Sequence, residues 1–230
     1  MSFNKNTNSS NTCSSNDSLS IAQLFRTYGR LKNFEKHAFI YQKNDISKAA
    51  YFIEEGLVKI CQFTDEGKDV TFFIRKPNEA FGLAEIVLDT PHPCYAQCLR
   101  NSKIWVLDSH VFHDVLESDP IIMKEVLYTL TNRLIHHQLN LELIVAKSAS
   151  WRLASLLNQL SITNAQGEKV VELMLTQEEL SNVVGCSRQT ISELLSKWRS
   201  DGIIEHDRKK NKKVLKLVKI DEILMKNYGV

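Results

Sequence analysis

The pattern of hydrophobic and polar positions divides the chain into three parts. Residues 31–108 carry short runs rich in β-branched and aromatic residues, such as AFIYQ, DVTFFIRK and KIWVLD, separated by the turn sequences KND, TDEG and KPNE. Many short strands at this spacing predict a β-roll of the jelly-roll type. Residues 121–149 contain neither Gly nor Pro and have apolar residues at helical spacing, which predicts one long helix. Short helical patterns and a VLKLVK run follow, so the expected fold class is α+β.

We therefore expect four segments. Residues 1–18, rich in Ser and Asn, form a disordered tail. Residues 19–120 form the β-roll, residues 121–148 the long helix, and residues 149–230 a C-terminal domain. The net charge of +2 indicates no partner by itself. No apolar run is long enough to cross a membrane. Five cysteines, an odd number spread widely, fit a reducing cytoplasm better than a disulfide framework.

The long helix carries leucines at alternating spacings of four and three, which is the pattern of a coiled-coil seam. We expect this seam to join two copies of the chain in a parallel homodimer. A second apolar strip, which includes Val126 and Ile135, is expected to pack on the β-roll of the same chain. The alternative is a helix that packs only on its own β-roll. The predicted dimer interface consists of Met123, Leu127, Leu130, Leu134 and Leu141.

The stretch LTQEELSNVVGCSRQTISELL predicts two short helices joined by a tight turn. Thr176 is followed three residues later by Glu179, which forms a capping box at a helix start. Gly185 allows the turn, and Ser187 can cap the second helix. The buried face of that helix is predicted to consist of Ile191, Leu194, Leu195 and Trp198. This arrangement is typical of a helix-turn-helix with a polar outer face on its second helix.

The outer face carries side chains that can recognise DNA bases. Arg188 can bond the O6 and N7 atoms of guanine; Gln189 can bond adenine or brace Arg188; Glu193 can accept from cytosine N4 or repel the backbone. Residues 208–219 hold seven Lys or Arg and no acid, which predicts a cationic wing. The alternatives are an ordinary helical hairpin with a solvated face, or a domain that contacts protein. The predicted DNA-contacting residues are Thr176, Ser187, Arg188, Gln189, Thr190, Ser192, Glu193, Lys209 and Lys210.

The same stretch resembles the DNA-binding motif of the CRP/FNR superfamily of bacterial transcription regulators. The resemblance extends upstream to the family's effector domain, a β-roll of the cyclic-nucleotide-binding type, and implies a homodimer, palindromic DNA sites and RNA polymerase as a partner. Asn44 and Asn78 stand where the family has glycine, a mild departure because Asn tolerates positive φ. The residues that carry the upstream resemblance are Phe39, Asp45, Tyr51, Phe52, Ile53, Gly56, Val58, Lys59, Gly67, Pro77, Phe81 and Gly82.

The resemblance also places an effector pocket. Cyclic-nucleotide binders use a Gly-Glu pair and an Arg-Ser or Arg-Thr pair, but here Leu83 replaces the Glu, and Pro93 and Cys94 replace the second pair. Without that Arg a buried phosphate would be poorly paired, which argues against cyclic AMP. We expect another small molecule, a redox signal or no ligand. The predicted pocket residues are Gly82, Leu83, Ala84, Glu85, Cys94, His137 and Gln138.

The sequence predicts no metal site and no catalytic site. Cys94 and Cys98, four residues apart on a strand, would lie about 13 Å apart. An iron–sulphur cluster needs four suitable thiolates, and only Cys13 lies near the N-terminus, so the cluster of FNR proteins is not expected. His92 is expected to be a loop residue and His137 a solvated or interface residue, with haem ligation as an open alternative. No metal-binding HxH pattern or other catalytic set occurs, so no enzyme activity is expected.

Overall fold

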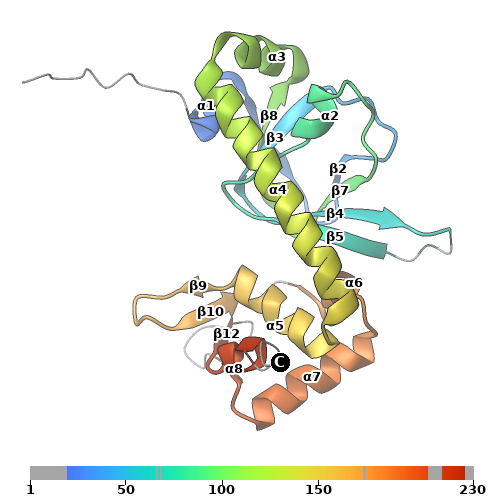
Figure 1. Cartoon of the computed structure of the whole chain (residues 1–230), viewed down its shortest axis with the longest axis vertical. Coiled ribbons are helices and arrows are strands. Elements are labelled where there is room, and N and C mark those ends of the chain that lie inside the picture. The colour runs from blue at the N-terminus through green and yellow to red at the C-terminus, as the bar shows by residue number, and fades with distance from the viewer. Residues whose placement is uncertain (1–19, 66, 68, 173–174, 207–213, 226–230) are drawn as a thin grey trace, which may run out of the picture.

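The computed structural model describes residues 20–65, 67, 69–172, 175–206 and 214–225, with the side chains of residues 139–145 left out. Figure 1 shows a β-roll at one end, a long helix α4 (Pro120–Ala146) beside it, and a smaller C-terminal domain at the far end of that helix. The predicted α+β fold is therefore confirmed. The predicted tail, residues 1–18, lies outside the described residues.

The β-roll consists of two four-stranded antiparallel sheets. One has the order β1-β8-β3-β6, and the other β2-β7-β4-β5. Alternate residues of the strands point into the space between the sheets, where Ile53, Val58, Ala96, Cys98 and Ile104 are fully buried. The strands are β1 (Arg30–Phe34), β2 (Phe39–Tyr41), β3 (Ala49–Glu55), β4 (Val58–Phe63), β5 (Asp69–Arg75), β6 (Ala80–Phe81), β7 (Tyr95–Cys98) and β8 (Ser102–Asp108).

Two turns of the β-roll use asparagine where positive φ is required. Asn44 has φ of 69° and Asn78 has φ of 67°. Both values fall in the left-handed region, which Asn tolerates better than most residues. The prediction that Asn substitutes for glycine in these turns is confirmed.

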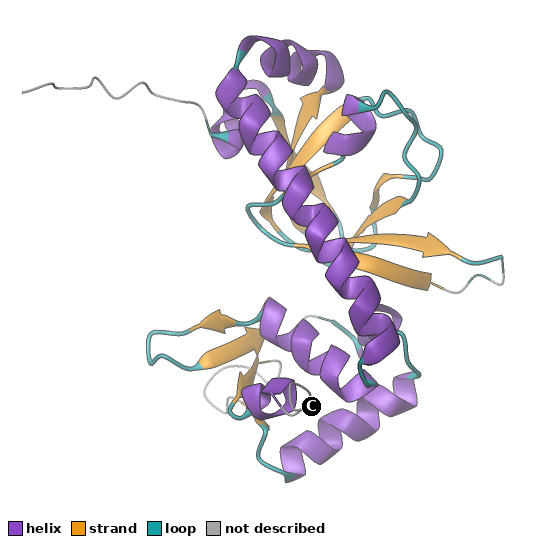
Figure 2. Cartoon of the chain, viewed as in Figure 1, coloured by secondary structure: helices purple, strands orange, loops and turns teal. Residues whose placement is uncertain are grey.

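Three helices and part of α4 cover the β-roll (Figure 2). The helices are α1 (Ile21–Tyr28), α2 (Leu83–Val87) and α3 (Ser109–Ser118). They share one core cluster with β3 and β8, in which Phe25, Phe52 and Phe112 are the largest fully buried side chains. Ile122 and Val126, one turn apart on α4, complete this cluster and anchor the N-terminal half of the long helix on the β-roll.

The long helix ends two residues before the predicted segment boundary at residue 148. It stops at Ala146, and α5 (Ala149–Leu160) begins after Ser148, whose hydroxyl accepts from the Trp151 N–H. An N-cap serine takes extended backbone angles, so it separates two helices that the apolar pattern alone would join.

The C-terminal domain surrounds a third hydrophobic core cluster. Its helices are α5, α6 (Gln177–Val184), α7 (Arg188–Ser200) and α8 (Ile220–Met225). Its sheet has the order β11 (Ile204–His206), β12 (Val214–Leu217), β10 (Lys169–Glu172) and β9 (Ile162–Thr163). Within the described part of the chain, no helix is both long enough and apolar enough to cross a membrane.

Candidate nucleic-acid interface and effector pocket

The first helix of the helix-turn-helix begins at the predicted capping box. The Thr176 hydroxyl accepts from the Glu179 N–H at 3.1 Å, and the Glu179 carboxylate accepts from the Thr176 N–H at 2.7 Å. The helix ends at Gly185, whose φ of 70° is left-handed. Glycine adopts this conformation without the steric cost that other residues have. Both predicted ends of α6 are confirmed.

The turn that follows is held by Arg152 of α5. Its guanidinium donates to the carbonyl oxygens of Val184 at 2.8 Å and of Gly185 at 3.3 Å. It also donates to the carbonyl of Lys147, in the link between α4 and α5, at 2.7 Å. A planar guanidinium can serve several acceptors at once. Arg152 therefore ties the end of α6 to the end of the long helix.

The second helix, α7, has one buried and one exposed face. Ser187 caps it, because its hydroxyl accepts from the Thr190 N–H at 3.0 Å. Ile191, Leu195 and Trp198 are buried, as predicted, and Leu194 is partly buried against the same core. The first turns of α7 expose three polar side chains, those of Arg188, Gln189 and Glu193. Ser192 is partly exposed.

Two residues of the exposed face contact each other. The Gln189 side-chain amide donates to the Glu193 carboxylate at 3.0 Å. Residues four apart lie on one side of a helix, whereas adjacent residues diverge, so Gln189 braces Glu193 and not Arg188. The suggested bracing of Arg188 is thus not what the structure shows. Lys209 and Lys210, the predicted wing contacts, lie outside the described residues.

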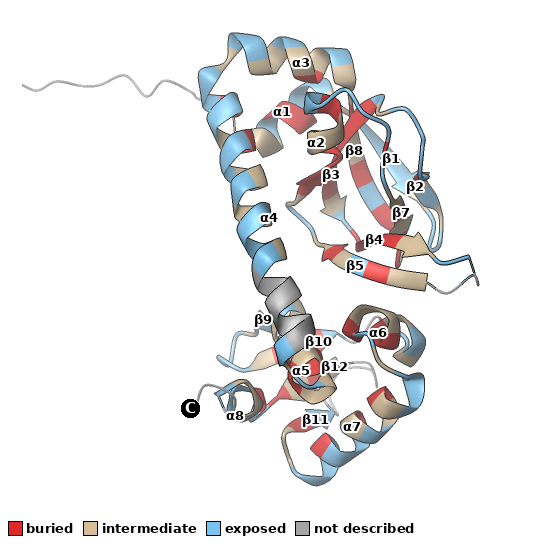
Figure 3. Ribbon diagram, turned by 45° about the vertical axis from the view of Figure 1, so that its right-hand side comes forward, coloured by how far each residue is buried: buried red, intermediate tan, exposed pale blue. Residues whose placement is uncertain are grey.

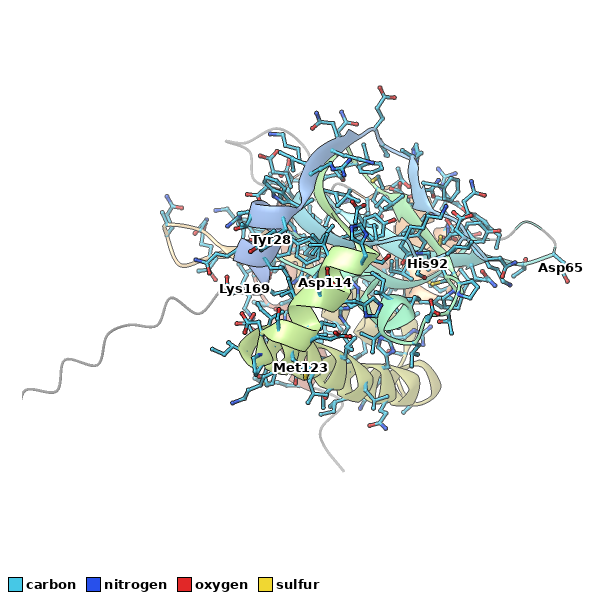
Figure 4. All side chains as sticks on the ribbon, turned by 90° about the horizontal axis from the view of Figure 1, so that it is seen from above. Tyr28, Asp65, His92, Asp114, Met123 and Lys169 are labelled. Atoms are coloured by element: carbon cyan, nitrogen blue, oxygen red, sulfur yellow. The ribbon has the colours of Figure 1, made fainter. Side chains whose placement is uncertain are left out.

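The long helix exposes most of its predicted dimer seam. Met123, Leu127 and Leu134 are 49%, 63% and 60% exposed, and much of α4 is exposed in Figure 3. Figure 4 shows Met123 on α4, outside the strands of the β-roll. Leu130 instead packs partly against the β-roll core. The side chain of Leu141 lies outside the described residues.

The helix face toward the β-roll differs from the predicted strip. Val126 is buried, as expected, but Ile135 is 49% exposed. At 3.6 residues per turn, residues 122, 126, 133 and 137 lie on one face, whereas residue 135 lies well round the helix from it. This face consists of apolar residues in its first half and of Arg133 and His137 further along.

The predicted pocket residues divide into two groups. Gly82 has φ of 71° and precedes α2, while Leu83 is fully buried in the core beneath the sheet. Ala84 and Glu85 are partly buried. Burial, reinforced by the Glu85 carboxylate, raises the pKa of Cys94 to about 11. Because the thiolate is the reactive form, this environment does not favour a redox role for Cys94.

The two histidines under discussion both pack against aromatic rings. His92 is only 1% exposed, and its ring lies parallel to Tyr41 with centroids 3.6 Å apart; Figure 4 places it within the outline of the β-roll. His137 stacks on Phe73 with centroids 4.0 Å apart. His137 is therefore not the solvated residue that was one of the expectations, and an interface position for it stays a prediction. Gln138, its neighbour, is exposed, and its predicted place in the pocket stays a prediction.

Comparison with known protein families agrees with this geometry. Residues 31–119 match the family model of the cyclic nucleotide-binding domain, and residues 151–222 match that of the Crp-like helix-turn-helix domain. The chain belongs to the CRP/FNR family of transcription regulators. The resemblance identified from the sequence is thereby confirmed.

Similar proteins of this CRP/FNR type cover most of the chain. The regulatory protein HlyX of Actinobacillus pleuropneumoniae is 25% identical over 80% of this chain and 78% of its own length. The fumarate and nitrate reduction regulatory protein of Vibrio cholerae is 24% identical over 79% of this chain and 74% of its own. The solved structure of FixK2 from Bradyrhizobium japonicum has the same fold, with a TM-score of 0.75 and 17% identity over 85% of this chain and 95% of that one. The absence of enzyme activity stays a prediction.

In this CRP/FNR regulator, the structure brings two further residues into the pocket region. The charge of Arg75, on β5, lowers the pKa of Arg133, on α4, and both side chains are partly buried. Neither was predicted. The available signals were the two-residue spacing from Phe73 to Arg75 on a strand, which puts both on one face, and the four-residue spacing from Arg133 to His137 on a helix.

The two domains of the regulator also contact each other. Leu57, Ile74 and Leu99 of the β-roll join the core of the C-terminal domain. The Lys36 ammonium lies 3.6 Å from the Glu179 carboxylate at the start of α6. Beside this contact is a cleft of about 400 Å³, lined by residues of both domains, Lys76 and Arg100 among them. The β-roll and the C-terminal domain are therefore packed together, not joined only by the long helix.

Proposed function

We propose that this protein is a sequence-specific DNA-binding regulator that acts as a homodimer on two-fold symmetric sites. The observation that carries the proposal is the exposed N-terminal end of α7, where Arg188, Gln189 and Glu193 project from a helix whose other face is buried. Helix-turn-helix proteins insert this end of the second helix into the major groove. Arg188 would bond guanine, and Thr176, Ser187 and Thr190 would contact phosphates.

The exposed strip of α4 supports the homodimer. Met123, Leu127 and Leu134 form an exposed apolar line on α4, beside the face that is anchored on the β-roll by Ile122 and Val126. A second copy would cover this line in a parallel pair and place two α7 helices on successive major grooves. Leu127→Glu should dissociate the dimer in sedimentation-equilibrium measurements at micromolar protein, whereas Ile135→Glu, an exposed site outside the seam, should not. Equal behaviour of the two variants would contradict the seam.

The signal is proposed to differ from cyclic AMP. Pro93 and Cys94 stand where the nucleotide-binding members have Arg and a hydroxyl residue, so a cyclic phosphate would lack its bidentate partner there. RNA polymerase as a partner and a cytoplasmic location stay predictions. In the described part of the chain, no three His, Cys, Asp or Glu side chains form a group that could hold a metal ion.

The proposal is tested by selecting bound sequences from random duplex DNA with the purified chain at physiological salt. The expected result is a two-fold symmetric site with half-sites about 10 base pairs apart. A guanine contact by Arg188 is worth about 1–3 kcal/mol per half-site. Arg188→Ala should therefore weaken binding to the selected site by about 30-fold to about 20,000-fold across both half-sites.

A matched control separates base reading from general charge. Arg199, also exposed on α7, lies at the helix end away from the proposed contact. Arg199→Ala should leave the selected sequence unchanged, while Arg188→Ala should lose the preference for guanine. No enrichment, and no salt-dependent duplex binding, would instead favour a ligand-binding module whose C-terminal domain contacts protein.

A further inference from the structure

Two arginines and a histidine meet between β5 and α4, close enough to the pocket residues Glu85 and Cys94 for their charges to interact. On β5, Phe73 faces the core between the sheets, and Arg75, two residues later, shares that face. On α4, Arg133 and His137 lie one turn apart on the face toward the β-roll. Phe73 joins the two elements, because His137 stacks on its ring and the Arg75 guanidinium carbon lies 5.4 Å from the ring centroid.

This cluster has more hydrogen-bond donors than acceptors. The nearest carboxylate oxygen to Arg75, on Glu79, is 3.8 Å from its Nη1, beyond hydrogen-bond length. The Nε of Arg75 and the Nε2 of His137 are buried without a hydrogen-bond partner. Arg133 donates to the backbone carbonyl of Ala80, which is an uncharged acceptor. The Arg Nε–H is always a donor, so leaving it buried and unpaired is costly, and an acceptor that reached it would be strongly favoured.

The neighbouring acids do not compensate the two cations. Burial and the charge of Arg75 lower the pKa of Arg133 to about 10, although Glu79 and Glu85 act in the opposite direction. Burial lowers the pKa of Arg75 as well. Both guanidinium groups are thus held in surroundings that oppose their charge. A negative group placed between them would reverse this effect.

We propose that Arg75 and Arg133 bind a small anion, through a carboxylate or phosphate group, with Phe73 and His137 forming the adjoining wall. A guanidinium fork can bond both oxygens of such a group, which a single ammonium cannot do. The inference rests on the proposed function only in naming the class of signal. It does not use Pro93 or Cys94, so the loss of the nucleotide-phosphate contacts does not affect it.

The position of Arg75 connects this site to the DNA-reading domain. Its neighbour Ile74 points the other way and packs in the C-terminal core with Leu180 and Val184 of α6. The next residue, Lys76, donates to the carbonyl of Gln159 at 3.0 Å. A shift of the end of β5 on anion binding would therefore be transmitted directly to α5 and α6.

The test is isothermal titration of the purified full chain, without DNA, with inorganic phosphate and with succinate. Succinamide, which has the shape of succinate without its charges, is the ligand control. At least one anion should bind with a dissociation constant of about 1 mM or lower. Arg75→Gln and Arg133→Gln should each weaken that binding about tenfold or more. Arg30→Gln removes an exposed arginine that pairs with Asp108 and should have no effect.

The outcomes are distinct. Binding of succinate alone would identify an organic acid as the ligand class, and binding of phosphate alone a phosphate ester. The absence of saturable binding by either anion, or binding that survives both substitutions, would overturn the proposal. Arg75→Lys, which keeps the charge and loses the fork, should bind more weakly than the native chain and guards against a folding defect in the Gln variants. If the chain bound an anion but selected no DNA sequence, the proposed regulator function would be refuted and the anion site would stand. If it selected a DNA sequence but bound no anion, the anion site would be refuted and the regulator function would stand.

Discussion

Replacement of Arg152 by Met should destabilise the C-terminal domain, because Arg152 holds the turn of the helix-turn-helix. Two of its three hydrogen bonds are short, at 2.7 Å to Lys147 and 2.8 Å to Val184. Hydrogen bonds from charged donors contribute about 1.5–3 kcal/mol each. Since Arg152 is partly exposed and the third bond is long, we expect a loss of about 3 kcal/mol in the free energy of unfolding. Met fills a similar volume, so the loss should reflect the bonds.

The domain can be followed by its own fluorescence. Trp151 and Trp198 are buried in the C-terminal domain, and Trp105 is the third tryptophan, in the β-roll. In a Trp105→Phe background, urea unfolding monitored by tryptophan emission reports the C-terminal domain alone. Arg152→Lys should lose about 2 kcal/mol, because one ammonium cannot serve carbonyls on separate elements. Arg199→Met, an exposed arginine, should change stability by less than about 0.5 kcal/mol. A loss below about 1 kcal/mol in Arg152→Met would refute the reasoning.

Two further predictions concern the β-roll. Gly56→Ala should lower the free energy of unfolding by about 3 kcal/mol or more, because Gly56 has φ of 122° and an added Cβ would lie 2.7 Å from the Ser102 backbone. Gly67→Ala, whose Cβ would meet nothing within 4 Å, should lower it by about 1–2 kcal/mol. Chemical denaturation of both variants measures the two losses, and equal losses would contradict the prediction. Burial lowers the pKa of His92 below its usual 6.5, so the unfolded chain takes up the proton first. The free energy of unfolding should be constant above about pH 6.5 and should decrease as the pH is lowered below that value. In denaturation curves between pH 7 and pH 5, this decrease should be less steep for His92→Gln than for the native chain. Identical slopes would rule out His92 as the cause.

Local rules in the sequence were sufficient for the elements of the DNA-reading motif. The Thr176–Glu179 capping box, the left-handed Gly185, the Ser187 cap and the positive φ of Asn44 and Asn78 were all predicted correctly. Each depends on interactions within a few residues, so the residue types themselves determine the conformation. The alternation of strand residues likewise predicted the β-roll, because the side-chain period of a strand is two.

The interior of the effector domain was decided only by the tertiary structure. The sequence shows Arg75, Arg133 and His137 on two elements far apart in the chain, and nothing local indicates that a strand and a long helix bring them together. The face of α4 toward the β-roll also depends on where Ile122 and Val126 first dock, which rotates Arg133 inward and leaves Ile135 exposed. A helix with apolar residues on several sides has no preferred orientation by itself. Packing against the β-roll of the same chain selects one orientation of α4. That orientation determines which helix face stays exposed for a second copy and which charged side chains are enclosed.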